Sequence, residues 1–88
     1  MSRLLVMKFE TEWCAPCRMM RPIISELMQE HASVEWAVLD AEEELEAVQK
    51  YGIMSVPTLV FIKDDVEVAR TIGYKTKKQL EEIISKNI

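Results

Sequence analysis

The spacing of apolar residues along the chain predicts an α/β fold. Short runs rich in large apolar residues indicate four strands, at residues 4–10, 34–39, 58–62 and 67–72. Apolar residues at three- and four-residue spacing indicate three helices, at residues 14 or 16 to 31, 42–51 and 76 onward. In the order βαβαββα, a helix joins two parallel strands and an antiparallel hairpin follows. We therefore expect a four-stranded mixed sheet flanked by three helices.

Local signals mark the ends of several of these elements. Gly52 suits the position after the second helix, where a left-handed backbone is common. Thr76 with Gln79 three residues later is a capping pattern that begins a helix. Residues 63–66 predict a tight hairpin turn, although they lack the usual glycine. The first helix should bury one face, including most of its methionines, and this face carries Met20, Ile23, Ile24, Leu27, Met28 and His31.

The size and charge of the chain limit its organisation and its partners. Its 88 residues allow one domain, over residues 1–88. The formal net charge of −4 and a pI near 5.0 argue against nucleic-acid binding. No apolar run approaches the roughly 20 residues of a membrane span. No signal peptide is visible, so we expect a cytoplasmic protein, although a mature secreted chain would look the same.

The only two cysteines of the chain, Cys14 and Cys17, lie where the first strand gives way to the first helix. The free N–H groups and the positive dipole end of a helix stabilise an anion at this position. Cys14 would lie exposed near the helix N-cap, where its thiolate is favoured. Pro16 suits the first turn, where a missing N–H costs nothing. Cys17 lies one turn further, near enough for a disulfide, so the pair is a candidate reversible dithiol.

Two other interpretations of the cysteines are half of a metal site and an inert pair. A zinc site needs about four ligands, and within one chain only His31 could join the cysteines. At a rise of 1.5 Å per residue, His31 lies roughly 20 Å or more from Cys14 along the helix. We therefore predict no metal site, and we expect His31 to cap the helix or to face solvent. In a reducing compartment a lone CxxC is more often catalytic than structural.

Three segments together resemble the thioredoxin family. They are the run Trp13-Cys14-Ala15-Pro16-Cys17, the later Val56-Pro57-Thr58, and Ile72-Gly73 before the last helix. The resemblance covers nearly the whole chain from Leu4. It implies a thioredoxin-like fold and a protein-disulfide oxidoreductase that needs no bound cofactor.

The same resemblance implies roles for individual residues. Cys14 would be the nucleophile, Cys17 the resolving thiol, and the bond between Val56 and Pro57 would be cis. The substrate-binding rim would comprise Trp13, Ala15, Pro16, Val56, Pro57, Ile72 and Gly73. The expected partners are proteins with disulfides and an electron donor, either glutathione or a reductase of the thioredoxin-reductase type. The protein is expected to be a monomer.

The chain also departs from the family pattern. The usual first strand and helix are missing, which leaves a minimal core the size of a glutaredoxin. Ala15 replaces the usual glycine between the cysteines. Lys8 occupies the position of a buried aspartate, on the strand face that carries Val6 and Glu10 and would point toward Cys17. If charged, Lys8 would favour thiolate. If neutral, it could accept a proton from Cys17. A third interpretation is that Lys8 only extends to water or reaches Glu10.

Two other classes of function stay open at this stage. One is a glutaredoxin-like reductase that uses glutathione, which suits Val56-Pro57, although the usual glutathione contact is not seen at residues 72–75. The other is a binding module in which the fold docks a partner and the thiols are incidental. In that case a variant without both cysteines would keep its biological effect.

Overall fold

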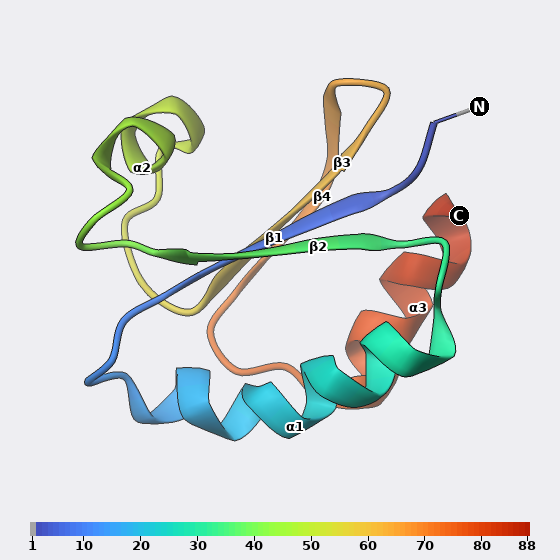
Figure 1. Ribbon diagram of the computed structural model, residues 1–88, viewed down its shortest axis with the longest axis horizontal. Coiled ribbons are helices and arrows are strands. Elements are labelled where there is room, and N and C mark those ends of the chain that lie inside the picture. Colours follow the sequence, from blue (N-terminus) through green and yellow to red (C-terminus); the bar gives the residue numbers. More distant parts are fainter. Residues whose placement is uncertain (1) are drawn as a thin grey trace.

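The computed structural model describes residues 2–88 and confirms the predicted order of elements (Figure 1). The strands are β1 (Leu5–Glu10), β2 (Glu35–Asp40), β3 (Thr58–Lys63) and β4 (Val66–Ile72). The helices are α1 (Ala15–Glu30), α2 (Leu45–Tyr51) and α3 (Lys77–Asn87). No helix within residues 2–88 is long and apolar enough to cross a membrane.

The strands form one mixed sheet in the order β2-β1-β3-β4. β1 runs parallel to β2 and antiparallel to β3, and β4 pairs antiparallel with β3. Parallel neighbours need a crossover connection, and α1 supplies it between β1 and β2. Figure 1 shows α1 and α3 on one face of the sheet and α2 on the other. The end of central strand β1 therefore leads directly into the beginning of α1.

Alternation along β1 divides the core into two parts. Val6 faces α1 and α3, where the larger cluster contains Leu4, Met20, Ile24, Leu27, Val34, Leu59, Phe61, Leu80 and Ile84. Met7 and Phe9 face α2 and form a smaller cluster with Val60. Burial of each large aliphatic or aromatic side chain contributes roughly 1.5–3 kcal/mol. The larger cluster therefore fixes α1 over the sheet, and the smaller one holds α2 on the opposite face.

The predicted end signals are present. Gly52 follows α2 in the left-handed region, with φ of 61°. In the hairpin between β3 and β4, Asp64 and Asp65 have φ of 54° and 63°, the backbone that a two-residue hairpin loop requires. At the start of α3, the Gln79 N–H donates to Thr76 Oγ1 at 3.2 Å, and the Thr76 N–H donates to Gln79 Oε1 at 2.9 Å. Aspartate therefore replaces glycine in the hairpin, and the capping box is confirmed.

Two local predictions are wrong. The second helix begins at Leu45 rather than at residue 42, because the Asp40 side chain accepts from the Glu42 N–H at 2.8 Å and holds a turn there. Of the methionines in α1, only Met20 lies in the core. Met19 and Met28 are exposed, since the buried positions of α1 are Cys17, Met20, Ile24 and Leu27.

Substitution of Thr76 by alanine should lower the free energy of unfolding by about 1 kcal/mol, because the N–H of Gln79 would lose its acceptor. Urea unfolding of the oxidised protein, followed by far-UV circular dichroism, measures this change. Gln79→Ala is the matched variant, since it keeps the Thr76 hydroxyl and removes only the reciprocal bond. A Thr76→Ala protein as stable as the parent would show that this cap does not stabilise α3.

Candidate active site

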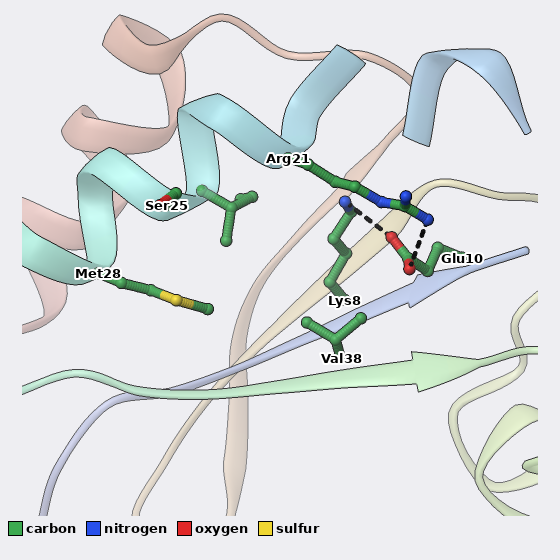
Figure 2. A pocket seen from close by; sticks show the side chains of 7 residues that line it. Lys8, Glu10, Arg21, Ser25, Met28 and Val38 are labelled. Atoms are coloured by element: carbon green, nitrogen blue, oxygen red, sulfur yellow. Dashed lines mark hydrogen bonds and ion pairs between the residues drawn. The ribbon is translucent and has the colours of Figure 1, made fainter. Parts of the chain in front are cut away.

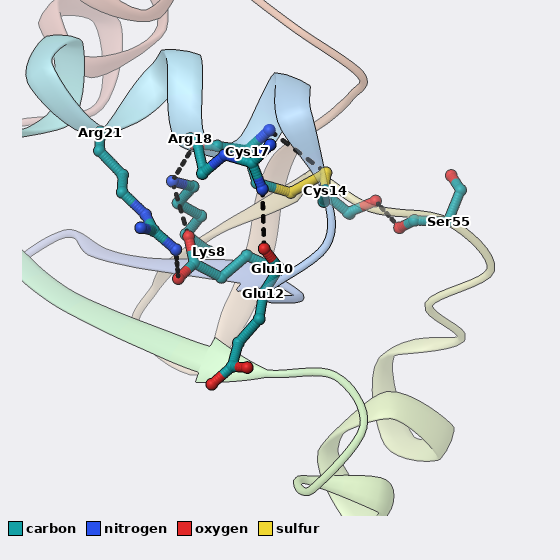
Figure 3. Close-up of a disulfide and its surroundings, with 9 residues drawn as sticks. Lys8, Glu10, Glu12, Cys14, Cys17, Arg18, Arg21 and Ser55 are labelled. Atoms are coloured by element: carbon teal, nitrogen blue, oxygen red, sulfur yellow. Dashed lines mark hydrogen bonds and ion pairs between the residues drawn. A yellow bond between two sulfur atoms is a disulfide. The ribbon is translucent and has the colours of Figure 1, made fainter.

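The two cysteines lie at the beginning of α1, as predicted. Cys14 is the N-cap residue, and its Sγ accepts a hydrogen bond from the Cys17 backbone N–H at 3.2 Å. The two residues form a disulfide across a Cα–Cα distance of 5.3 Å (Figure 3). The sulfur of Cys14 thus occupies the position at which a helix N-terminus stabilises negative charge.

Both cysteines are buried. The expectation of an exposed Cys14 is wrong, because its side chain turns toward the first turn of α1 and the residue is only 4% exposed. Cys17 is fully buried. The neighbours of Cys14 are exposed instead: Trp13 is 68% exposed, and Ala15 and Pro16 also face solvent. These three residues therefore form the solvent-exposed surface next to Cys14.

The two other predicted rim segments, Val56-Pro57 and Ile72-Gly73, contact each other at the ends of β3 and β4. The Val56–Pro57 bond is cis, as the resemblance implied. The Gly73 N–H donates to the Pro57 carbonyl at 2.8 Å, and Ile72 pairs with Thr58 across β3 and β4. Pro57 is buried, Val56 and Gly73 are half-buried, and Ile72 is exposed. The two predicted rim segments therefore lie side by side.

A groove of about 450 Å³ connects the cysteine motif with the segment before Pro57. Its lining is mainly apolar and comprises Thr11, Trp13, Ala41, Glu42, Val48, Ile53, Met54, Ser55 and Val56. Trp13 and Val56 were predicted as rim residues, and the groove contains both. Thr11, Ile53 and Ser55 were missed, although each lies within three residues of a predicted site residue. Three further lining residues were also missed: Ala41, Glu42 and Val48. An extended peptide can lie along such a groove.

Lys8 lies under the beginning of α1 and is 1% exposed. Its Nζ donates to the Cys17 carbonyl oxygen at 3.0 Å (Figure 3). The same Nζ lies 2.9 Å from Glu10 Oε1 (Figures 2 and 3). The prediction that Lys8 points toward Cys17 is confirmed. The interpretation that its side chain extends to water is wrong, whereas the contact with Glu10 is present. Both neighbours are acceptors, which suits an ammonium as the donor.

Glu10 joins Lys8 to a second cation. Glu10 Oε2 accepts from Arg21 Nη2 of α1 at 3.2 Å. Burial raises the pKa of the Glu10 carboxyl, but hydrogen bonds and charge from Lys8 and then Arg21 outweigh burial, and the net effect is a lowered pKa. These three side chains border a cavity of about 260 Å³ whose other lining residues are Ile24, Ser25, Met28 and Val38 (Figure 2). The cavity therefore contains a short chain of alternating charges.

One cluster within residues 2–88 combines side chains that could ligate a metal. Glu30, His31 and Glu81 each place a ligand atom within 4.8 Å of the others. His31 caps the C-terminus of α1 and contacts Glu81 of α3, as an ion pair if it is protonated, and Lys77 pairs with Glu30. The contacts present already account for the cluster, since they join the end of α1 to α3. The prediction that His31 caps the helix is confirmed.

The amino-acid sequence matches the family model described as Thioredoxin over residues 1–86. The chain is 38% identical to a thioredoxin of Bacillus subtilis (strain 168), over 91% of this chain and 78% of the relative. It is 42% identical to a thioredoxin of Alicyclobacillus acidocaldarius, over 88% of this chain and 74% of the relative.

Solved structures agree with these sequence matches. A thioredoxin of Fasciola hepatica superposes with a TM-score of 0.92 at 40% identity, covering 98% of this chain and 82% of that one. A thioredoxin of Nicotiana alata gives a TM-score of 0.93 at 33% identity, covering 99% of this chain and 75% of that one. The predicted thioredoxin-like fold is confirmed.

The lowered pKa of Glu10 predicts how stability depends on pH. Its contribution is complete above its ordinary value of 4.5 and is lost as the pH falls through the lower value of the folded protein. At pH 7, Glu10→Gln should therefore be less stable than the parent by about 1–3 kcal/mol. In urea unfolding measured from pH 7 to pH 3, this difference should shrink on acidification. A difference that stays constant with pH would mean that the carboxylate charge of Glu10 does not stabilise the fold.

Proposed function

This chain belongs to the thioredoxin family, and we propose that it reduces protein disulfides, with Cys14 as the attacking thiolate and Cys17 as the resolving thiol. Membership of the family together with the Cys14–Cys17 pair makes it a thiol–disulfide oxidoreductase. Its substrates are disulfides of other proteins, and an external reductase keeps the dithiol reduced. The observation that carries the assignment of roles is the position of Cys14 at the N-cap of α1, where its sulfur accepts the Cys17 N–H.

The reaction proceeds in two exchanges. The Cys14 thiolate attacks one sulfur of the substrate disulfide, a mixed disulfide forms, and the other substrate sulfur leaves as a thiolate and takes up a proton. The Cys17 thiol then loses its proton and attacks the Cys14 sulfur. This second exchange forms the Cys14–Cys17 disulfide and releases the second substrate sulfur as a thiol. Two electrons pass to the substrate, and the 5.3 Å Cα–Cα distance lets the pair close without moving the backbone.

Substrate docking would use the rim around Cys14. The exposed Trp13, Ala15 and Pro16 supply one side, and the exposed Ile72 with Gly73 supplies the other. The backbone of Val56, held in place by Pro57, would pair with an extended substrate segment as a short antiparallel contact. The mainly apolar groove beside Trp13 and Val56 supports this arrangement, because it offers room for neighbouring substrate side chains.

The electron donor distinguishes a thioredoxin from a glutaredoxin. We favour a reductase of the thioredoxin-reductase type, and we infer a monomer in a reducing compartment such as the cytoplasm. Glutathione is the alternative donor, since Val56-Pro57 is compatible with it. Reduction of the oxidised protein by a thioredoxin reductase, compared with reduction by glutathione alone, separates the two. Faster reduction by glutathione would identify a glutaredoxin-like enzyme.

Lys8 would act as a modulator of the thiols. Its ammonium donates to the Cys17 carbonyl. The family pattern has a carboxylate at the position of Lys8. A positive charge at this point favours thiolate over thiol, stabilises the reduced form, and makes the disulfide more oxidising. The buried environment strengthens this effect because solvent screens it little.

The two thiols should have different roles in a substrate-trapping experiment. Cys14→Ser should abolish insulin reduction and leave little reactivity toward iodoacetamide at pH 7. Cys17→Ser should accumulate a stable mixed disulfide through Cys14, since no second thiol can release it. Non-reducing gels and mass spectrometry identify the trapped species. More trapping by Cys14→Ser than by Cys17→Ser would reverse the assignment, and a biological effect that survives loss of both thiols would favour a binding module.

Lys8→Met should make the potential of the dithiol more reducing by some tens of millivolts, where about 30 mV corresponds to 1.4 kcal/mol. The physical reason is the loss of positive charge beside Cys17. A glutathione redox titration measures the potential, and alkylation at several pH values should show a midpoint moved upward. Lys86→Met, at an exposed position of α3, controls for the change in net charge. Equal potentials and equal alkylation profiles for parent and Lys8→Met would contradict the role of Lys8.

A further inference from the structure

Glu10 is held between two cations that differ in their surroundings. Its Oε1 lies 2.9 Å from Lys8 Nζ, whose side chain is 2% exposed, and its Oε2 lies 3.2 Å from Arg21 Nη2, whose side chain is 51% exposed. Figure 3 shows the chain of contacts from Arg21 through Glu10 and Lys8 to Cys17. Arg21 can exchange its partner for water, whereas buried Lys8 cannot. Loss of Glu10 would therefore affect Lys8 more than Arg21.

Within residues 2–88, no other charged side chain lines this cavity. α1 contributes Arg21 together with Ile24, Ser25 and Met28, and β2 contributes Val38 opposite Lys8. On the other side of β1, β3 places Leu59 next to Lys8. Asp40 pairs with Glu10 in the strand register, but its carboxylate accepts from the Glu42 N–H. Among the residues that line the cavity, only Glu10 supplies a negative charge to compensate the Lys8 ammonium.

Removal of Glu10 would leave Lys8 with the Cys17 carbonyl as its remaining partner. A buried charge without a counter-charge is strongly destabilised, so it loses its proton or moves toward water. Either response would remove the positive charge from the carbonyl of Cys17. Glu10 therefore controls whether the ammonium can stay beside the dithiol.

We propose that Glu10 is a positioning residue for the dithiol, which sets the thiol–disulfide equilibrium by holding the Lys8 ammonium against Cys17. The proposal rests on the oxidoreductase function and on the role of Lys8 given above. Glu10 touches neither sulfur in the contacts of this site and acts only through Lys8. Its loss should therefore resemble the loss of Lys8, and the two effects should not add.

The test is a double-mutant cycle on the equilibrium with glutathione. In this reaction the Cys14–Cys17 disulfide is reduced to the dithiol, two glutathione thiols are oxidised to one glutathione disulfide, and two electrons and two protons are transferred. Glu10→Gln should lower the equilibrium constant for reduction at least threefold, in the same direction as Lys8→Met. In the Lys8→Met background, Glu10→Gln should change the constant less than twofold.

Two matched variants separate this role from a general effect of charge. Glu12→Gln removes the same charge from an exposed position two residues before Cys14 and should change the constant less than twofold. Arg21→Gln removes the other partner of Glu10 and should also change it less than twofold, because Lys8 keeps its counter-charge. An unchanged constant for Glu10→Gln, a shift toward reduction, or an equal shift in both backgrounds would overturn the proposal.

A measurement on the unaltered protein covers the case in which Glu10→Gln does not fold. The NMR signals of the Lys8 Cε and Nζ should shift when Glu10 is protonated below pH 4.5 and again when the dithiol is reduced. Lys8 signals that respond to neither change would overturn the proposal. Because both experiments use only the dithiol and glutathione, they do not depend on protein-disulfide reduction. Failure of insulin reduction would count against the proposed function and leave these equilibria interpretable.

Discussion

The structure depends on the junction at which central strand β1 becomes helix α1. Four residues, 11–14, connect the two elements. Cys14 caps the N-terminus of α1 by accepting a hydrogen bond from the Cys17 N–H. The apolar cluster around Val6, Met20 and Leu59 holds the helix that begins here against the sheet. A free N–H at a helix start is normally satisfied by water or a side-chain oxygen. Here a sulfur takes that place, so the fold itself favours a thiolate.

The elements could be predicted because their signals are local. Short apolar runs in the strands, a period near 3.6 in the helices, and the capping pair Thr76 and Gln79 all act within a few residues. The start of α2 could not be predicted in this way, because residues 42–44 form a turn on Asp40 instead. The Asp40 side chain accepts from the Glu42 N–H, and its backbone carbonyl accepts from the N–H groups of Glu43 and Glu44. The exposure of Met19 and Met28 depends on how α1 is rotated on the sheet. Apolar character alone does not specify that rotation, since surfaces also contain apolar side chains.

In the candidate site, too, residues of local motifs could be predicted, whereas residues brought in by the fold could not. The cysteines and Pro57 belong to short motifs, so their positions in the sequence identify them. Thr11 and Glu42 reach the groove only because β1 and β2 end side by side at this edge of the sheet, in the pairing of Glu10 with Asp40. The exposure of Cys14 also could not be derived from its place in the chain. It depends on the direction of one side chain, which turns inward to meet Cys17.

Lys8 and Glu10 show that a buried charge needs an opposite charge nearby. An ammonium beneath the cysteine helix is costly to desolvate unless acceptors surround it. The Cys17 carbonyl provides one acceptor, but it carries no net charge, so a carboxylate is also needed. Glu10 supplies it from the same strand and the same face, two residues away, where alternation along β1 places both side chains under α1. Arg21 then compensates Glu10 at the surface. The charge beneath the dithiol is thus a property of three side chains, and an effect measured for any one of them includes the response of the other two.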